Sequence, residues 1–288
     1  MTERVGVAKT YKLYIGGKFP RSESGRSCPV TSHDGAFLAN AAQASRKDLR
    51  DAVVAARGAF GGWSGATAYN RGQVLYRVAE VMEGRRQQFV AEVRDAEGLA
   101  VDSAESVVDT AIDRWVWYAG WTDKLAAVLG ATNPVAGPYF SFTVPEPTGV
   151  VGVLAPQRSS LLGLVSVLAP VLATGCTAVV VSSAARPLPA ITLAEVLATS
   201  DVPGGVVNVL TGQAAELGPW LASHADVNAL DLTGADAEQR VELARAAAET
   251  VTRVLRLPER EPDWTTPPGI ARLRAYLEDK TVWHPMGV

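Results

Sequence analysis

The side chains that could act as nucleophiles or metal ligands are few in this chain, and they are scattered. The two cysteines, Cys28 and Cys176, lie in distant segments, and no CxxC pair occurs. The histidines also lie in unrelated segments, without HxxxH or HExxH spacing; they are His33, His224 and His284. A zinc site or a disulfide framework needs clustered ligands. The sequence therefore predicts neither, and we expect surface or capping roles for the histidines.

Cys176 is the thiol to weigh as a nucleophile. It lies in an apolar run, at 173–179, just before a stretch that predicts a buried strand. Apolar surroundings raise the pKa of a thiol, whereas the reactive form is the thiolate. Free cysteine is also among the residue types most often buried. We therefore predict that Cys176 is a small core residue and that the chain carries no catalytic thiol.

Charge and composition exclude several classes of protein. Lysine and arginine number 27 against 30 aspartate and glutamate residues, which gives a net charge of −3. A duplex-binding surface normally shows a clustered basic excess, so we expect no nucleic-acid partner. With 48% hydrophobic residues in 288, the chain can bury the core of one large α/β domain or of two small ones.

One segment has the length of a membrane span. Residues 161–181 carry no charge, but Pro170 and Gly175 interrupt them, and β-branched residues follow Gly175. This pattern favours a buried helix, a turn and a buried strand over a spanning helix. The first residues show no apolar run of the secretory type. We therefore expect no membrane association, and a cytoplasmic protein.

Strands and helices alternate from Gly149 to about Pro258. The predicted strands are 150–154, 178–181, 206–210, 229–232 and 253–257. The predicted helices are 160–173, 187–199, 214–223 and 236–250. Short apolar strands separated by helices of this length indicate parallel βαβ units. The fold class is therefore α/β, with a doubly wound, Rossmann-like parallel sheet.

The flanking segments have other patterns. Residues 11–32 predict a strand, a tight turn and a second strand. Helices are expected over 45–63, with Ser45 as N-cap, over 70–97 as one helix or two, and over 101–125. Proline and glycine bracket a projecting hairpin within 130–146. A charged, proline-rich linker at 259–269 leads to a short helix and a tail strand that contains Val282 and Trp283.

Many short runs in this order resemble the NAD(P)-dependent aldehyde dehydrogenase superfamily over nearly all of the chain. The runs are LYIGGK at 13–18, AVVAARGAF at 52–60, GPYFSF at 137–142, EPTGVVG at 146–152, LAPVLATG at 168–175, PGGVVNVLTG at 203–212, LTG at 232–234 and YLEDKTVW at 276–283. The resemblance implies a dinucleotide-binding domain followed by an oligomerisation hairpin and tail. It also implies NAD(P) as cofactor and aldehyde oxidation as activity.

The chain departs from the family where the chemistry lies. In the family a Pro-Trp-Asn-Phe motif ends the first Rossmann strand, and its Asn stabilises the oxyanion. Here Pro156 is followed by Gln157, and Arg158 stands at the Asn position. The family's general-base glutamate falls near 255–258, where Arg256 takes its place. The complete second domain, which supplies the family's nucleophilic cysteine, is missing between the linker and the tail. We therefore predict no catalytic residue.

The cofactor residues depart as well. The family's Lys-Pro-Ser-Glu run, which binds the adenosine ribose, corresponds to residues 181–184, so that Val181 and Ala184 replace both polar anchors. No GxGxxG occurs. The resemblance leaves vestigial cofactor-binding positions at Pro156, Gly212, Thr233 and Gly234. We expect no bound cofactor, although residual NAD(P) affinity stays open, because the fold by itself does not decide it. We expect no metal.

The domain organisation follows from the same resemblance. Residues 1–125 and 148–258 form a degenerate NAD-binding domain, 126–147 and 270–288 the oligomerisation hairpin and tail, and 259–269 the linker that replaces the catalytic domain. In the family the tail strand extends the catalytic-domain sheet of a neighbouring subunit. Without that domain, we expect the tail to remain an unpaired edge strand, which is an aggregation hazard.

Three functions are open at this point. The first is a catalytically dead structural or regulatory subunit of a full-length aldehyde dehydrogenase, joined through the 126–147 hairpin, the 236–250 helix and the 276–286 tail. The chain then resembles the shortened second unit of two-unit family members. The second is a component of an NAD(P)-dependent aldehyde oxidoreductase that is active only in complex. The third is a stand-alone nucleotide-binding protein.

Overall fold

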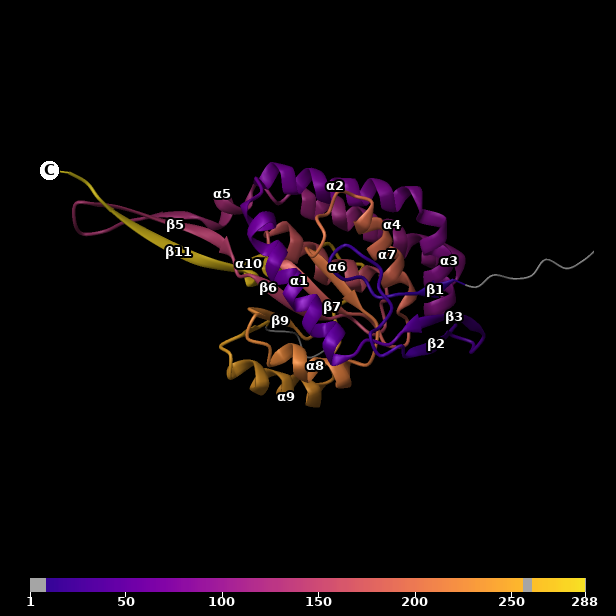
Figure 1. Cartoon of the computed structure of the whole chain (residues 1–288). Coiled ribbons are helices and arrows are strands. Elements are labelled where there is room, and N and C mark those ends of the chain that lie inside the picture. The colour runs from indigo at the N-terminus through magenta and orange to yellow at the C-terminus, as the bar shows by residue number, and fades with distance from the viewer. Residues whose placement is uncertain (1–8, 256–260, 288) are drawn as a thin grey trace, which may run out of the picture.

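A five-stranded parallel sheet forms the centre of the protein in the computed structural model, which describes residues 9–255 and 261–287 (Figure 1). Its strands lie in the order β10-β9-β6-β7-β8. Their bounds are β6 Val150–Leu154, β7 Thr177–Val181, β8 Val207–Leu210, β9 Ala229–Asp231 and β10 Arg253–Val254. The predicted doubly wound sheet is thus confirmed. Of the fifth predicted strand, 253–257, residues 256 and 257 lie outside the described residues.

Alternation along the strands divides the interior into two cores. In β6, Val151 and Val153 face one core and Val150 and Leu154 face the other. The same alternation continues in β7 and β8 because successive strand side chains point to opposite faces. Both cores are apolar, so the strands read as continuous hydrophobic runs, as expected for a sheet covered on both sides.

Helices cover both faces of the sheet. On one side α6 (Leu162–Ala173) and α7 (Leu188–Ala198) pack on the strands. Outside them lie α2 (Ala68–Gly84), α3 (Arg86–Glu97) and α4 (Val101–Ala119), whose buried residues belong to the same core. On the other side lie α1 (Arg46–Gly65), α8 (Ala214–Ala222) and α9 (Ala237–Ala248). Residues 161–181 therefore form a buried helix and a strand, and no helix in the described part of the chain has the length and apolarity of a membrane span.

A side-chain cap and a change of backbone angles determine where the N-terminal helices begin and where they are interrupted. Ser45 caps α1, as predicted, and Asp48 closes a capping box with it. The segment 70–97 forms two helices because Arg85 leaves the helical region. Two glycines with positive φ, Gly16 and Gly17, form the predicted tight turn.

The predicted strand pair within 11–32 is only partly present. The chain pairs across the glycine turn at a single bridge, between Ile15 and Lys18. A separate sheet contains β1 (Thr10–Tyr11), β3 (Phe37–Ala42) and β2 (Ser27–Thr31) in that order. Tyr14 instead bridges to Val209 of the large sheet, which anchors this segment to the main domain.

A long arm projects from the domain (Figure 1). It consists of β4 (Ala131–Asn133), β5 (Tyr139–Pro147) and β11 (Leu277–Pro285), in the order β11-β5-β4. The short helices α5 (Leu125–Leu129) and α10 (Ala271–Ala275) precede β4 and β11. The prediction of an unpaired tail is wrong: β11 pairs with β5 over nine residues, from Leu277 opposite Pro147 to Pro285 opposite Tyr139. The hairpin of the same chain supplies the partner strand, and the outer edge of β11 remains open.

Candidate functional site

The carboxyl edge of the sheet is where a doubly wound fold binds ligands. After β6 the chain forms β7 and β8 on one side of that strand, whereas β9 pairs with the other side of β6. The strand order therefore reverses between β6 and β9, which is the usual position of a cofactor crevice. Pro156 follows β6, Gly212 follows β8, and Thr233 and Gly234 follow β9, so all the predicted cofactor positions lie at this edge.

The loop after β6 is fastened to the loop after β7. The Gln157 side chain donates to the Ala155 carbonyl at 2.7 Å and accepts from the Ala184 amide at 3.0 Å. Ser183 donates to the Gln157 carbonyl at 3.0 Å. The loop is thus held by its own neighbours, and the exposed Arg158 contributes its backbone carbonyl, which accepts from Arg186. No hydrogen bond in the described structure holds the Arg158 side chain where the family's Asn amide would stand.

Gly234, which follows β9, lies directly against the backbone at the end of β6. Its amide donates to the Leu154 carbonyl at 2.8 Å, and a Cβ at this position would overlap the Ala155 carbonyl oxygen. Only glycine fits so near a neighbouring backbone. Pro156 and Gly234 therefore both lie at the carboxyl edge, where Gly234 packs on the backbone of Leu154 and Ala155. Gly212 lies two strands away from β6 and packs near Ala44 and Leu217.

A buried carboxylate, Asp231, ends β9 at the same edge. It is fully buried and accepts the Tyr276 hydroxyl at 2.9 Å and the Thr233 hydroxyl at 2.5 Å. Arg272 of α10 forms an ion pair with it and donates to the Thr233 hydroxyl at 3.1 Å. Thr233, a predicted cofactor position, is thus occupied by structural hydrogen bonds.

Electrostatics in this cluster favour the ion pair. Burial by itself would lower the pKa of the Arg272 guanidinium, but the Asp231 carboxylate outweighs burial, and the net shift is upward. Burial, reinforced by the same carboxylate, raises the pKa of Tyr276 well above its usual value. Arg272 therefore stays charged and Tyr276 stays neutral, which are the states that each needs in order to donate to Asp231.

The linker segment is held over the cluster. Arg114 of α4 is buried and donates to the carbonyls of Trp264 and Thr266, at 2.7 and 2.9 Å, and to the Ser166 hydroxyl at 2.8 Å. The Arg272 guanidinium lies 5.5 Å from the centre of the Trp264 ring. The described part of the linker, 261–269, therefore covers the region beside β9 as a fixed part of the fold.

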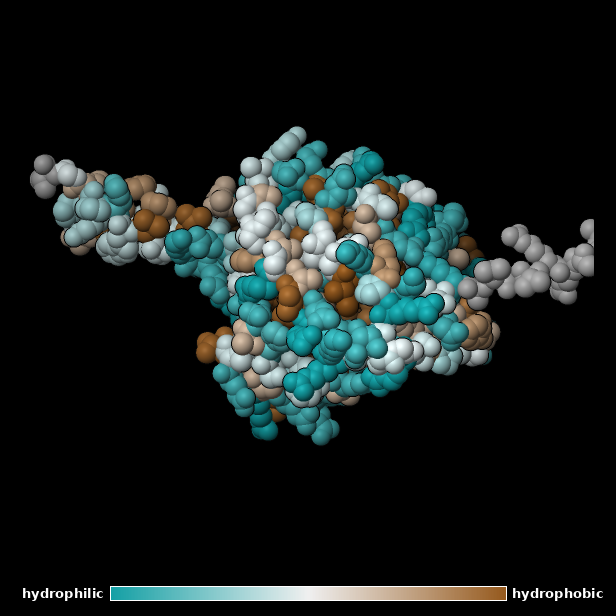
Figure 2. All heavy atoms as spheres, in the orientation of Figure 1, coloured by the Kyte–Doolittle hydropathy of each residue, from teal (hydrophilic) through white to brown (hydrophobic). Residues whose placement is uncertain are grey.

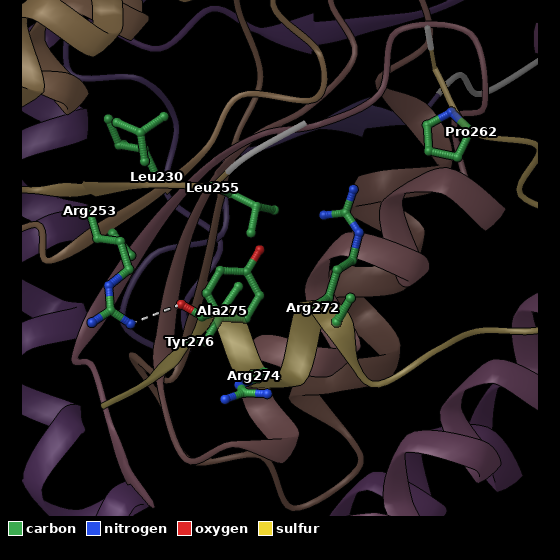
Figure 3. Close-up of a pocket in the computed structure, with 11 residues that line it drawn as sticks. Leu230, Arg253, Leu255, Pro262, Arg272, Arg274, Ala275 and Tyr276 are labelled. Atoms are coloured by element: carbon green, nitrogen blue, oxygen red, sulfur yellow. Dashed lines mark hydrogen bonds between the residues drawn. The ribbon is translucent and has the colours of Figure 1, made fainter. Parts of the chain in front are cut away.

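A cavity of about 630 Å³ remains under α10, against β9 and β10. Figure 3 shows Arg272 and Arg274 extending from α10, and Arg253 reaching the backbone of α10 from β10. Arg253 donates to the Ala275 carbonyl at 3.2 Å and to the Leu277 carbonyl at 2.8 Å. Of the three arginines, two are thus committed to holding α10 in place, so this cavity has a structural lining rather than a reactive one.

A second feature of the edge is a groove of about 260 Å³ between α8 and α9, called here the acidic groove. Its lining includes Asp236, Glu238 and Glu242. Asp236 also caps α9, accepting the Gln239 amide at 2.8 Å, and Gln239 completes a capping box. A carboxylate already occupies the helix terminus that would otherwise attract a phosphate.

These residues do not fit a nicotinamide dinucleotide. The acidic groove beside this edge presents several carboxylates, which repel the negative pyrophosphate of a dinucleotide. Val181 is buried in the core and Ala184 offers no polar side chain, so neither can hold a ribose hydroxyl. We therefore derive no hydride-transfer step in this chain.

The thiols are placed away from the carboxyl edge. Cys176 directly precedes β7, at the opposite, amino edge, and is completely buried. Burial raises the pKa of its thiol, which donates to the Tyr276 carbonyl at 3.4 Å. Cys28 is free and lies in the separate N-terminal sheet. Arg256, the expected replacement of the general base, lies outside the described residues, which also hold no metal-competent cluster of His, Cys, Asp and Glu.

Comparison with known proteins agrees with this geometry. The family model described as "Aldehyde dehydrogenase family" matches residues 20–257. The "Aldehyde dehydrogenase family 2 member B4, mitochondrial" of Arabidopsis thaliana is 34% identical over 240 residues, which are 82% of this chain and 44% of that protein. The match ends at the border of the linker, and α10 and β11 follow it.

Two solved structures are similar in fold. The HpcC structure from Thermus thermophilus has a TM-score of 0.81 at 30% identity and covers 85% of this chain and 47% of its own. The NAD+ complex of an aldehyde dehydrogenase from Bacillus cereus has a TM-score of 0.80 at 28% identity and covers 85% of this chain and 50% of its own. The chain spans half or less of the length of each of these relatives.

Proposed function

We propose that this chain, which belongs to the aldehyde dehydrogenase family, is a non-catalytic structural or regulatory subunit that assembles with a full-length aldehyde dehydrogenase. The proposal has two parts, the lack of chemistry in this chain and the need for a partner. The cytoplasm is the compartment we propose for it, since both cysteines are free, as is usual there.

The state of the carboxyl edge supports the first part. Acyl transfer to a thiol needs a thiolate, a base and an oxyanion hole at one place. Here Cys176 is buried at the amino edge of the sheet, and Asp231 is fully engaged with Tyr276, Thr233 and Arg272. Thr233, a predicted cofactor position, is taken up by hydrogen bonds with Asp231 and Arg272.

The second part of the proposal, the need for a partner, depends on a single observation, the exposed surface of the projecting arm. In β11, Leu277 is buried and Val282 is half-buried, while the other residues are exposed. Large apolar side chains on the arm are about half exposed; they are Tyr139, Phe140, Trp283 and Met286. Figure 2 shows that hydrophobic residues, in brown, lie on the surface of the projecting arm. A thin sheet without a core of its own is marginally stable in water.

The partner we propose is a family member with an intact catalytic domain. The open outer edge of β11 runs for nine residues, about 30 Å at the usual rise of a strand. Such an edge can add to the sheet of another chain, where backbone hydrogen bonds supply affinity and alternate side chains supply specificity. Helix α9, whose outer face exposes Val241, is the second contact that we propose.

Affinity purification of the tagged chain from its native cell tests this proposal. We expect a full-length aldehyde dehydrogenase to co-purify, and Phe140→Asp with Trp283→Asp to abolish this. Tyr69→Asp, at a residue that is 69% exposed on α2, is the matched control and should leave the complex intact. Recovery of the chain without any family member would contradict assembly.

The activity of the mixed complex separates the first function from the second. If this chain is non-catalytic, aldehyde oxidation disappears when the partner's catalytic cysteine is replaced and persists in Arg158→Ala of this chain. Loss of activity in Arg158→Ala, with assembly unchanged, would instead make this chain part of the active site.

A further inference from the structure

We propose that the cavity between the start of α1 and the end of α8 binds a small aromatic anion, a planar ring joined to a phosphate, such as a mononucleotide. The two helices contact each other there, at the lower end of α1 in Figure 1. The cavity measures about 620 Å³, which is in the usual range for a small-molecule site. This inference is independent of the proposed subunit function.

An aromatic ring and a cation form one wall of the α1–α8 cavity. Trp220 of α8 is 43% exposed, and the Arg46 guanidinium lies 3.6 Å from the centre of its ring. Among the described residues Arg46 has no carboxylate partner, so this cation is compensated by the indole alone. A stacked guanidinium and indole offer a planar surface on which an aromatic ring can lie.

Cations surround the rest of the opening. Lys47 and Arg50 continue along α1, and His224 follows α8. The carboxylate of the lining, Glu23, is 3.7 Å from the Lys47 ammonium, while Arg50 pairs with the exposed Asp51 outside the cavity. With three permanent cations and one carboxylate, the lining favours an anion.

The floor adds an apolar contact. Leu49 lies in the lining and is almost completely buried, so it can support a ring without being displaced. Arginine can form two parallel hydrogen bonds with a phosphate, and Arg46, which has no carboxylate partner among the described residues, lies at the rim. The geometry thus supplies a flat apolar surface beside cationic donors, which is the complement of a ring linked to a phosphate.

The cavity differs from the acidic groove on the other side of α8. That groove presents Asp236, Glu238 and Glu242, whereas the α1–α8 cavity presents Arg46, Lys47 and Arg50. An anion that reaches α8 should therefore prefer the side facing α1. This contrast also allows binding at the two places to be separated by mutation.

Titration of the full chain with adenosine 5′-monophosphate, by calorimetry and by the indole N–H signals in nuclear magnetic resonance, tests the site. We expect saturable binding at millimolar ligand or below, with the Trp220 signal shifting. Trp220→Ala and Arg46→Ala should each weaken binding by about 10-fold, the size of one lost stacking contact. Adenosine and ribose 5-phosphate should each bind about 10-fold more weakly, since each lacks one half of the ligand.

The double variant Glu238→Gln and Glu242→Gln is the matched control and should leave the affinity unchanged. All these side chains are exposed, so unaltered thermal unfolding will show that the fold is intact. Absence of saturation at millimolar ligand would overturn the proposal, as would binding that Trp220→Ala and Arg46→Ala do not weaken. Equal affinity for ribose 5-phosphate would also overturn it, since the ring would then contribute nothing.

Discussion

Tyr276 of α10 donates its hydroxyl to the carboxylate of Asp231 across 2.9 Å, and the two residues are 45 positions apart in the chain. Arg272 completes the cluster through its ion pair with the same carboxylate. The tail is thereby joined to the carboxyl edge of the central sheet, at the point where a doubly wound fold usually leaves space for a ligand. The cluster therefore ties α10 to this edge and also occupies Thr233, one of the predicted cofactor positions.

Replacing Arg272 by alanine should destabilise the protein strongly. The change leaves Asp231 buried without its cation, which costs about 3–5 kcal/mol. Urea unfolding followed by circular dichroism measures the free energy of unfolding. The exposed neighbour Arg274, for which no ion pair is present within the described residues, is the control, and its alanine variant should stay within about 0.5 kcal/mol of the parent. Equal losses of unfolding free energy in Arg272→Ala and Arg274→Ala would contradict a stabilising role for the ion pair between Arg272 and Asp231.

The buried carboxyl of Glu92 should make stability depend on pH. Burial raises its pKa, although the side chains of Thr192, Gln88 and Tyr11 donate to it. With a folded pKa above the unfolded value, the folded state binds the proton more tightly. The contribution of Glu92 to stability is therefore greatest below the unfolded pKa, and it is lost as pH rises through the folded pKa.

Glu92→Gln should remove that part of the pH dependence. Between the unfolded and the folded pKa of Glu92, the difference in unfolding free energy between the parent and Glu92→Gln should change steadily with pH. Above the folded pKa the difference should level off. Urea titrations at a series of pH values measure this difference. A difference that stays constant over the whole series would show that the Glu92 carboxyl titrates equally in the folded and unfolded states.

Cys176 should be inert toward thiol reagents in the native protein. It is completely buried, whereas Cys28 is half-buried. In the Cys28→Ala variant, reaction with a disulfide reagent should follow global unfolding and accelerate only when denaturant is added. Rapid native-state modification of that variant would mean that the thiol is accessible and would reopen its candidacy as a nucleophile.

In the double variant Arg46→Ala with Trp220→Ala, which removes the proposed α1–α8 site for an adenosine phosphate, calorimetric titration with NAD+ and NADP+ should give no binding heat at millimolar cofactor. The carboxylates of the acidic groove and the lack of polar side chains at Val181 and Ala184 are the physical reasons. Removing the acidic charge as well, by Glu238→Gln with Glu242→Gln, should not restore binding because Val181 and Ala184 still offer no polar side chain for a ribose hydroxyl. Saturable cofactor binding to the double variant Arg46→Ala with Trp220→Ala would favour the stand-alone nucleotide-binding function.

Much of the fold could be predicted because its signals are local. The alternation of apolar strands and helices over 149–258 implies a parallel sheet, and Ser45 with Asp48 carries its own capping geometry. Tail pairing could not be predicted in this way. The family's tail extends another subunit's sheet, and nothing in the sequence of β11 indicates that β5 of the same chain pairs with it.

The central cluster was missed for a related reason. Asp231 lies in a predicted apolar strand, and an acidic residue there needs a buried cation. That signal was available. Its partner, Arg272, is 41 residues away, and spacing alone cannot select it among the 27 lysine and arginine residues of the chain.

The most direct test of the account is the absorbance at 340 nm of the purified chain alone, incubated with NAD+ or NADP+ and a panel of aliphatic and aromatic aldehydes. We predict no formation of reduced cofactor above the rate without protein. In the described structure, a thiolate, a base and an oxyanion donor do not come together at the carboxyl edge of the sheet. Steady reduction that scales with the concentration of the chain, and that a homogeneous preparation retains, would contradict the account.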